Sequence, residues 1–137
     1  MPSILSRTTN PSDIIAFVDR IIGGLPLLVI GLSHVLWEGA AMQPLVEAMG
    51  LPLAGVLAPV AVALEIAAGV SLLLGYWTRA GALLAIVTMA AAFYSHLAID
   101  VWPNPQEPPL LLPLVILASA VFLLWRGGGR WSLDARA

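Results

Sequence analysis

The sequence predicts an all-α integral membrane protein, a bundle of four helices in an up-down-up-down arrangement. Of its 137 residues, 60% are hydrophobic and only 10% are charged, whereas soluble domains carry about 25% charged residues. Apolar stretches of the length that crosses a bilayer core, about 20 residues for roughly 30 Å, recur between proline- and glycine-containing connections. No polar stretch is long enough to fold by itself, so we expect one membrane domain over residues 1–137.

The first helix is expected over about 14–37, with Ser12 or Asp13 as its N-cap. The leader before it is polar and lacks a small-residue cleavage site, so this helix is expected to remain in the mature protein. Asp19 and Arg20 fall in its first turns, where we expect the lipid headgroups. Three glycines in its apolar part allow another helix to approach closely, namely Gly23, Gly24 and Gly31.

The second helix is expected over 53–77, after the tripeptide Gly50-Leu51-Pro52. The connection before it contains MQPLVEAMG, for which we expect a short amphipathic turn on the membrane. The only acidic or basic side chain between 53 and 77 is Glu65, near the middle. A charge at that depth costs on the order of 2.5–3.5 kcal/mol on insertion scales, so we expect Glu65 to face the bundle interior.

The third and fourth helices are expected over about 80–100 and 110–125. The segment 102–109 between them is rich in proline and cannot be helical, because proline removes a backbone donor and restricts the residue before it. The fourth helix ends at Arg126 with three glycines, and WSLDARA forms a short tail.

The arginines set the expected orientation of the bundle. All six basic residues lie at one set of helix ends, and the two connections at the opposite ends carry only acidic charges: Glu38, Glu47, Asp100 and Glu107. By the positive-inside rule, both termini and the Thr78-Arg79 turn are expected in the cytoplasm, in a multi-pass protein of the plasma (inner) membrane.

Composition also limits the chemistry. Cysteine is absent, so the chain runs no thiol–disulfide exchange and supplies no thiolate to a zinc or iron–sulfur site. A redox role would therefore need a bound cofactor or a partner protein. Nothing in the charge pattern resembles a nucleic-acid footprint.

Several motifs in a fixed order carry a resemblance to a known family. They are Asp19-Arg20 followed by glycines and Gly31-Leu-Ser-His34, the Gly50-Leu51-Pro52 tripeptide, the pattern from Glu65 through Gly69 to Leu74-Gly75 and Thr78-Arg79, the Asn104 and Glu107 element, and GGGRWSLD at 127–134. The chain resembles the DoxX family of small membrane proteins over nearly its whole length. In that family a basic residue often occupies the place of His34.

The resemblance implies a redox-associated membrane subunit. Related proteins are tied to thiosulfate:quinone oxidoreductase and to membrane complexes that detoxify radicals and oxidants. The catalytic residues of the family are not well defined, so the resemblance assigns no roles to residues of this chain.

Glu65, His34 and His96 are the candidate catalytic residues. Both histidines lie near the outer ends of helices that run in the same direction, at about 7 Å above Glu65 if each residue rises 1.5 Å. Intramembrane ionisable residues point to function by default, and a protonatable cluster suits a quinone or quinol site. The alternative is structural: a carboxyl that sets helix register, and histidines that each bond a backbone carbonyl or a serine. A haem or a metal ion held through His34, His96 and Glu65 stays open on ligand type alone.

Other candidates for ligand binding lie nearby. Tyr94, beside Ser95, is either an interfacial aromatic or a donor to a ligand carbonyl, and Asn104 and Glu107 belong to a solvated loop or to a lid. Arg20 is expected to pair with Asp134 or with another inner carboxylate, and the SLD tail to fold back as a cap under the bundle.

The leading hypothesis is a quinone or quinol site in a membrane subunit that works with a partner redox protein. Electrons would come from that partner, because the sequence encodes no electron carrier. The alternatives are a non-catalytic anchor or assembly subunit in the lipid bilayer, and a carrier of a small solute or metal ion, which would need a homo-oligomer.

Overall fold

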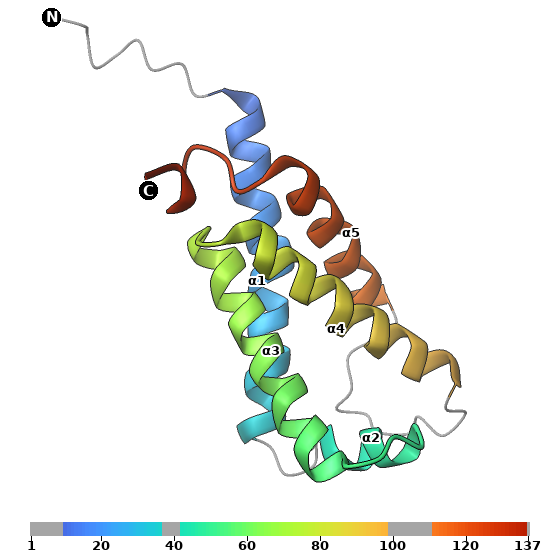
Figure 1. Ribbon diagram of the computed structural model, residues 1–137. Coiled ribbons are helices and arrows are strands. Elements are labelled where there is room, and N and C mark those ends of the chain that lie inside the picture. Colours follow the sequence, from blue (N-terminus) through green and yellow to red (C-terminus); the bar gives the residue numbers. More distant parts are fainter. Residues whose placement is uncertain (1–9, 37–41, 99–110, 137) are drawn as a thin grey trace, which may run out of the picture.

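The computed structural model describes residues 10–36, 42–98 and 111–136, and every regular element in these ranges is a helix. In chain order the elements are α1 (Pro11–Leu36), α2 (Met42–Ala48), α3 (Ala54–Leu74), α4 (Thr78–Ala98), α5 (Leu111–Arg126) and the 3₁₀ turn η3 (Asp134–Arg136). The four long helices alternate in direction, so the start of α1, the α3–α4 turn and the C-terminal tail share one end of the bundle (Figure 1). The predicted all-α bundle is confirmed.

The helices have the length and apolarity of membrane spans. In the described ranges, three stretches are long and apolar enough to cross a bilayer: Pro11–Leu36, Ala54–Leu74 and Thr78–Ser95. α5 is equally apolar but has 16 residues, about 24 Å at 1.5 Å per residue, less than the roughly 30 Å of a bilayer core. Large apolar side chains on the outer faces are exposed, such as Val29, Val56 and Val87. The molecule is an integral membrane protein whose apolar exterior suits lipid.

Each long helix packs against two others. α1 packs against α3 and α5, and α4 also packs against α3 and α5, while the short α2 packs against α3 at the end opposite the tail (Figure 1). Buried side chains from all four long helices form the core: Leu27, Ala68, Leu72, Ala82, Ala85, Met89, Ile116, Ala120 and Leu123. The short turn expected in MQPLVEAMG is the helix α2, and Val46 forms a small separate core with Ala54 and Ala58.

α1 begins at Pro11 rather than at 14, and its N-cap is Asn10. The Asn10 side-chain oxygen accepts a hydrogen bond from the Ser12 N–H at 3.2 Å. Pro11 takes the first helical position, where its fixed φ and missing N–H cost nothing. The N-cap expected at Ser12 or Asp13 is therefore wrong. Asp13 is buried, and its Oδ1 accepts a hydrogen bond from the Arg130 N–H in the tail at 3.2 Å.

Glycines bring α1 and α3 close together, as expected for Gly24 and Gly31. A Cβ added to Gly69 of α3 would lie 2.7 Å from the Leu28 nitrogen, and one added to Gly24 would lie 3.1 Å from the Gly69 oxygen. Further along, a Cβ on Gly31 would lie 3.2 Å from the Ile66 nitrogen. The backbones of the two helices are therefore in contact over several turns, as small residues allow at membrane helix interfaces.

α3 ends at Leu74, three residues before the expected 77. Gly75 takes the left-handed conformation with φ 66, its N–H donates to the Leu72 oxygen at 3.2 Å, and the Tyr76 N–H donates to the Ser71 oxygen at 3.1 Å. This pattern is typical of a glycine that terminates a helix, because glycine adopts positive φ without steric cost.

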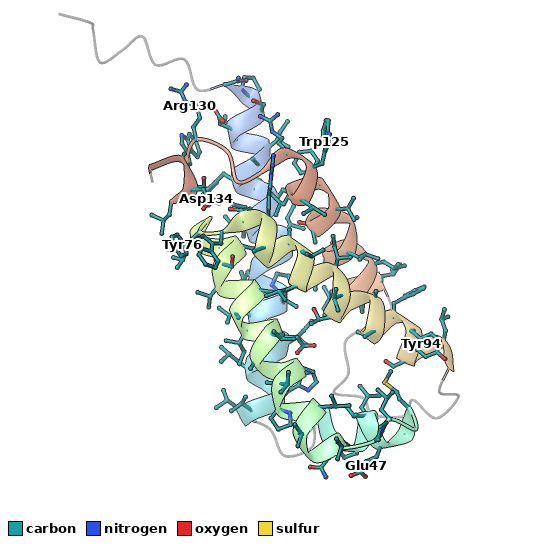
Figure 2. The ribbon with its side chains drawn as sticks, in the orientation of Figure 1. Glu47, Tyr76, Tyr94, Trp125, Arg130 and Asp134 are labelled. Atoms are coloured by element: carbon teal, nitrogen blue, oxygen red, sulfur yellow. The ribbon has the colours of Figure 1, made fainter. Side chains whose placement is uncertain are left out.

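α4 begins at Thr78 rather than at 80, because the C-terminal tail caps it. The Asp134 carboxylate accepts hydrogen bonds from the Trp77 N–H at 2.7 Å and from the Thr78 N–H at 2.8 Å. The tail backbone also joins the end of α3, since the Asp134 N–H donates to the Gly75 oxygen at 2.9 Å. Figure 2 shows Asp134 beside this turn, close to Tyr76. The prediction that the SLD tail folds back as a cap is confirmed.

Candidate functional site

Glu65 lies near the middle of α3 and faces the bundle interior, as its position in an apolar helix predicted. Glu65 is 3% exposed, and the residues on either side of it in α3 are apolar. On one side, a Cβ built on Gly31 of α1 would lie 3.3 Å from the Glu65 Cβ. On the other side, Glu65 helps to line a cavity next to α4. The carboxyl therefore sits in the wall between the α1–α3 interface and that cavity.

His34 and Glu65 are brought together across α1 and α3. The His34 Nε2 lies 3.8 Å from the Glu65 Oε2, and their side chains are 6% and 4% exposed. The glycine at 31, one helical turn before His34, is what lets the two backbones approach this closely. An imidazole and a carboxyl at this separation form an ion pair when the histidine is protonated. Both groups can carry a proton, so the pair is a candidate for proton handling.

The cavity beside Glu65 lies between α2, α3 and α4 and has a volume of about 270 Å³. This is slightly below the range of roughly 300–1,000 Å³ that is usual for ligand pockets. α3 and α4 meet at the tail end and diverge toward α2, which lies across the opposite end (Figure 1). The lining is apolar except for Glu65, Thr88 and Ser95. An apolar cavity with a few polar groups is the usual form of a small-molecule site.

A second cavity of about 370 Å³ lies on the other side of α3. His34 lines it together with Gln43 of α2 and apolar residues of α3 such as Ala58 and Val62. The His34–Glu65 pair therefore connects the two cavities, with Glu65 facing one and His34 facing the other.

Of the other predicted residues, the structure describes the side chain of Tyr94, which is not brought to this pair. Tyr94 is 62% exposed and points away from the bundle (Figure 2), and it does not line either cavity. His96 lies on α4 one residue after Ser95, but its side chain is outside the described part of the structure. Asn104 and Glu107 also lie outside the described residues. The three-residue cluster of His34, Glu65 and His96 therefore stays a prediction.

Arg20 is 2% exposed and lies among protein side chains at the tail end of the bundle. Its guanidinium carbon is 5.4 Å from the centre of the Phe17 ring, and its Nη2 donates to the Trp131 oxygen in the tail at 3.3 Å. Gly75, at the end of α3, lies against Arg20 and against Ser132 of the tail: a Cβ at Gly75 would overlap the guanidinium, so this position accepts only glycine. Arg20 is thus a structural residue that joins α1 to the tail.

Asp134 interacts electrostatically with Arg20, as the sequence predicted. Partial burial by itself raises the pKa of Asp134, but the hydrogen bonds from the Thr78 and Trp77 N–H groups and the Arg20 charge lower it below the ordinary value of 3.8. The net direction is downward because the N–H groups and the guanidinium all stabilise the ionised carboxylate.

Comparison with known proteins agrees with this architecture. The family model for DoxX matches residues 15–98, which covers the His34–Glu65 pair and the cavity-lining parts of α3 and α4. The chain belongs to the DoxX family. A curated relative of this DoxX protein is the "Uncharacterized membrane protein Rv3486" of Mycobacterium tuberculosis, 28% identical over 141 residues that cover 96% of this chain and 85% of the relative. No solved structure matches the chain.

Sequence reasoning missed Thr88 as a residue of the cavity. Thr88 and Ser95 are seven residues apart on α4, two helical turns, and therefore lie on one face of the helix. Two hydroxyls at this spacing in an alanine-rich helix are a usable signal. The divergence of α3 and α4, which opens the cavity in front of them, has no counterpart in the sequence.

Proposed function

We propose that this DoxX protein is a redox-associated membrane subunit that binds a quinone or quinol in the cavity between α2, α3 and α4. The His34–Glu65 pair in the cavity wall carries this proposal. Quinone chemistry couples electrons to protons, and a buried carboxyl next to an imidazole handles the protons. A partner oxidoreductase supplies or accepts the electrons, since the chain has no cysteine to hold an iron–sulfur cluster.

The surroundings of the cavity support a lipid-soluble ligand. Residues that line it also lie exposed on the apolar exterior, including Val60 and Val87, which are 49% and 58% exposed. A ligand dissolved in the hydrocarbon core can therefore reach the cavity sideways, without passing through water. The apolar lining accommodates a ring and the start of its isoprenoid tail, while Glu65 contacts the polar edge of the ring.

The arrangement also separates ligand contact from proton exchange. Glu65 faces the ligand cavity, and His34 faces the second cavity together with the polar Gln43 of α2. A proton received by Glu65 passes to His34 and leaves toward the end of the bundle where α2 lies. By the positive-inside rule this end faces outward, so proton release occurs at the outer surface.

A double-mutant cycle on His34 and Glu65 tests the proposal. Binding of 2-decyl-1,4-benzoquinone is measured in nanodiscs for His34→Ala, Glu65→Gln and the double variant. We expect each single change to weaken binding and the double variant to be no weaker than the worse single, because contacting residues couple energetically. Ser33→Ala is the matched control, since Ser33 adjoins His34, lines neither of the two cavities and donates to the Ile30 oxygen of its own helix.

The same assay addresses His96. If His96 belongs to the site, we expect the double variant that carries His34→Ala and His96→Ala to bind the benzoquinone as weakly as either single variant. Strictly additive small losses would make both histidines structural. Unchanged binding in every variant would contradict the quinone site and favour the anchor or assembly function.

A further inference from the structure

The two hydroxyls in the cavity beside Glu65 already donate their protons to their own helix. The Thr88 Oγ1 donates to the Leu84 oxygen at 3.0 Å and lies 3.2 Å from the Ala85 oxygen. The Ser95 Oγ donates to the Ala92 oxygen at 2.7 Å, and the residue is fully buried. Each hydroxyl has one proton and two lone pairs, so with the proton engaged by the helix it can serve a group in the cavity that these residues line only as an acceptor.

We propose that the cavity selects the reduced form of its ligand, a hydroquinone, over the oxidised quinone. This inference rests on the proposed function and names which of the two redox forms the site takes. The polar groups of the cavity are Thr88, Ser95 and Glu65. An ionised carboxylate is an acceptor only, so in that state the cavity offers the ligand three acceptors.

The hydrogen-bond requirements of the two forms differ. A hydroquinone presents O–H donors, which bond to the Thr88 or Ser95 oxygen while the existing bond to the helix stays intact. A quinone presents carbonyl acceptors, and to bond them a hydroxyl must first withdraw its proton from the helix. The rest of the cavity lining is apolar. A quinone carbonyl that finds no hydrogen-bond donor there would lose the hydrogen bond that it made with water at the membrane interface.

Glu65 then acts on the bound hydroquinone as a general base. The ligand O–H bond breaks, its electron pair stays on the ligand oxygen, and a new O–H bond forms on the Glu65 carboxylate. His34, 3.8 Å from Glu65, accepts the proton next. This places the protein at the step where hydroquinone is deprotonated, before any electron reaches a partner.

The test compares two forms of one probe on the full-length protein in nanodiscs without oxygen: 2-decyl-1,4-benzoquinone and its hydroquinone. We expect the hydroquinone to bind about fivefold more tightly, the effect of about one net hydrogen bond. Thr88→Val with Ser95→Ala should bring this ratio to about one by weakening hydroquinone binding alone. Each single variant should lower this affinity ratio partway, so the single variants still test the inference if the double variant fails to fold.

Thr88→Ser and Ser33→Ala are the matched controls, and both should keep the hydroquinone preference. The first retains the hydroxyl in the cavity, and the second removes a hydroxyl that bonds its helix in the same manner outside the cavity. Equal or tighter binding of the quinone, or a preference that survives the loss of both hydroxyls, overturns this inference while leaving a quinone site in place. Failure of both forms to bind overturns the proposed function itself.

Discussion

Glu65 shows what a single buried carboxyl requires in an apolar helix. Removal from water costs a carboxyl free energy, so the fold must provide a polar neighbour or a cavity beside it. Around Glu65 the fold provides both, His34 and the cavity between α2, α3 and α4. Asp134 shows the opposite case at the membrane edge, where two backbone N–H groups and a buried arginine favour the charged carboxylate. The same type of side chain is thus buried beside an imidazole at one site and caps a helix at the other.

Substitution of Glu65 separates a role in ligand-dependent activity from a role in folding. Glu65→Gln keeps a polar group of the same size, and Glu65→Leu removes a group that is costly to bury, so we expect both variants to fold. Glu65→Leu should abolish ligand-dependent activity, whereas its thermal stability in detergent should equal or exceed that of the wild type. Full activity in Glu65→Leu would make Glu65 a structural residue.

Loss of the Asp134 cap should destabilise the protein in a pH-dependent manner. We expect Asp134→Ala to cost roughly 0.5–2 kcal/mol, as when other helix-capping residues are replaced by alanine. The folded-state pKa of Asp134 lies below its ordinary value of 3.8, so its contribution is complete above that value and is lost as the pH falls through the folded pKa. The difference in unfolding midpoint between wild type and variant should therefore be constant from about pH 5 to pH 8 and shrink in stronger acid. A difference independent of pH would contradict the role of the charge.

At the scale of elements, contact between α1 and α3 holds the site together. Gly24, Gly31 and Gly69 let the two backbones touch, and this contact sets the separation of His34 from Glu65. Dispersion and weak backbone contacts dominate such interfaces in lipid, because apolar helices gain nothing from leaving water there. Small residues are therefore required at these positions, and larger ones would increase the separation of His34 from Glu65.

Gly69→Ala should destabilise the bundle, and Gly55→Ala should not. A Cβ at Gly69 would lie 2.7 Å from the Leu28 nitrogen, whereas a Cβ at Gly55, in the first turn of the same helix, meets nothing within 4 Å. We expect a cost of about 1–3 kcal/mol for Gly69→Ala, the usual range for overpacking. Unfolding in detergent by urea measures both variants. Equal stability of the two would show that α1 and α3 are not in backbone contact.

At the scale of the whole molecule, the tail closes the bundle at one end. It bonds the start of α1 through the Arg130 N–H and Asp13, covers Arg20, and joins the end of α3 to the start of α4. Figure 2 shows Arg130 and Asp134 at this end, opposite Glu47 on α2. The tail is therefore a part of the fold, and the cavities lie toward the other end.

Reporter fusions test how this molecule is oriented in the membrane. The connections opposite the tail end contain no arginine, and all six arginines belong to the other set of helix ends, so a reporter fused after Ala137 should be active in the cytoplasm. A reporter inserted at Gln43 should be active outside. The reverse pattern would overturn the charge argument and would direct proton release from His34 to the inner side.

The sequence by itself determined the features that depend on local composition. Long apolar runs predicted the membrane helices, prolines and glycines marked their connections, and one carboxyl in an apolar run pointed to Glu65 in the interior. The motifs also indicated the DoxX family, which the family model confirmed. Each of these signals is contained in a short stretch of chain, so no knowledge of distant contacts was needed.

Tertiary structure decided what depends on residues far apart in the chain. The first residue of α4 is set by Asp134, 56 residues later, and the burial of Arg20 is set by a tail 111 residues away. The approach of His34 to Glu65 needs Gly31 and the packing of α1 on α3, and the cavity with Thr88 exists because α3 and α4 diverge. Caps, close contacts and cavities arise from the geometry of packed elements, and hydrophobic periodicity along one segment carries no information about which distant segment packs against it.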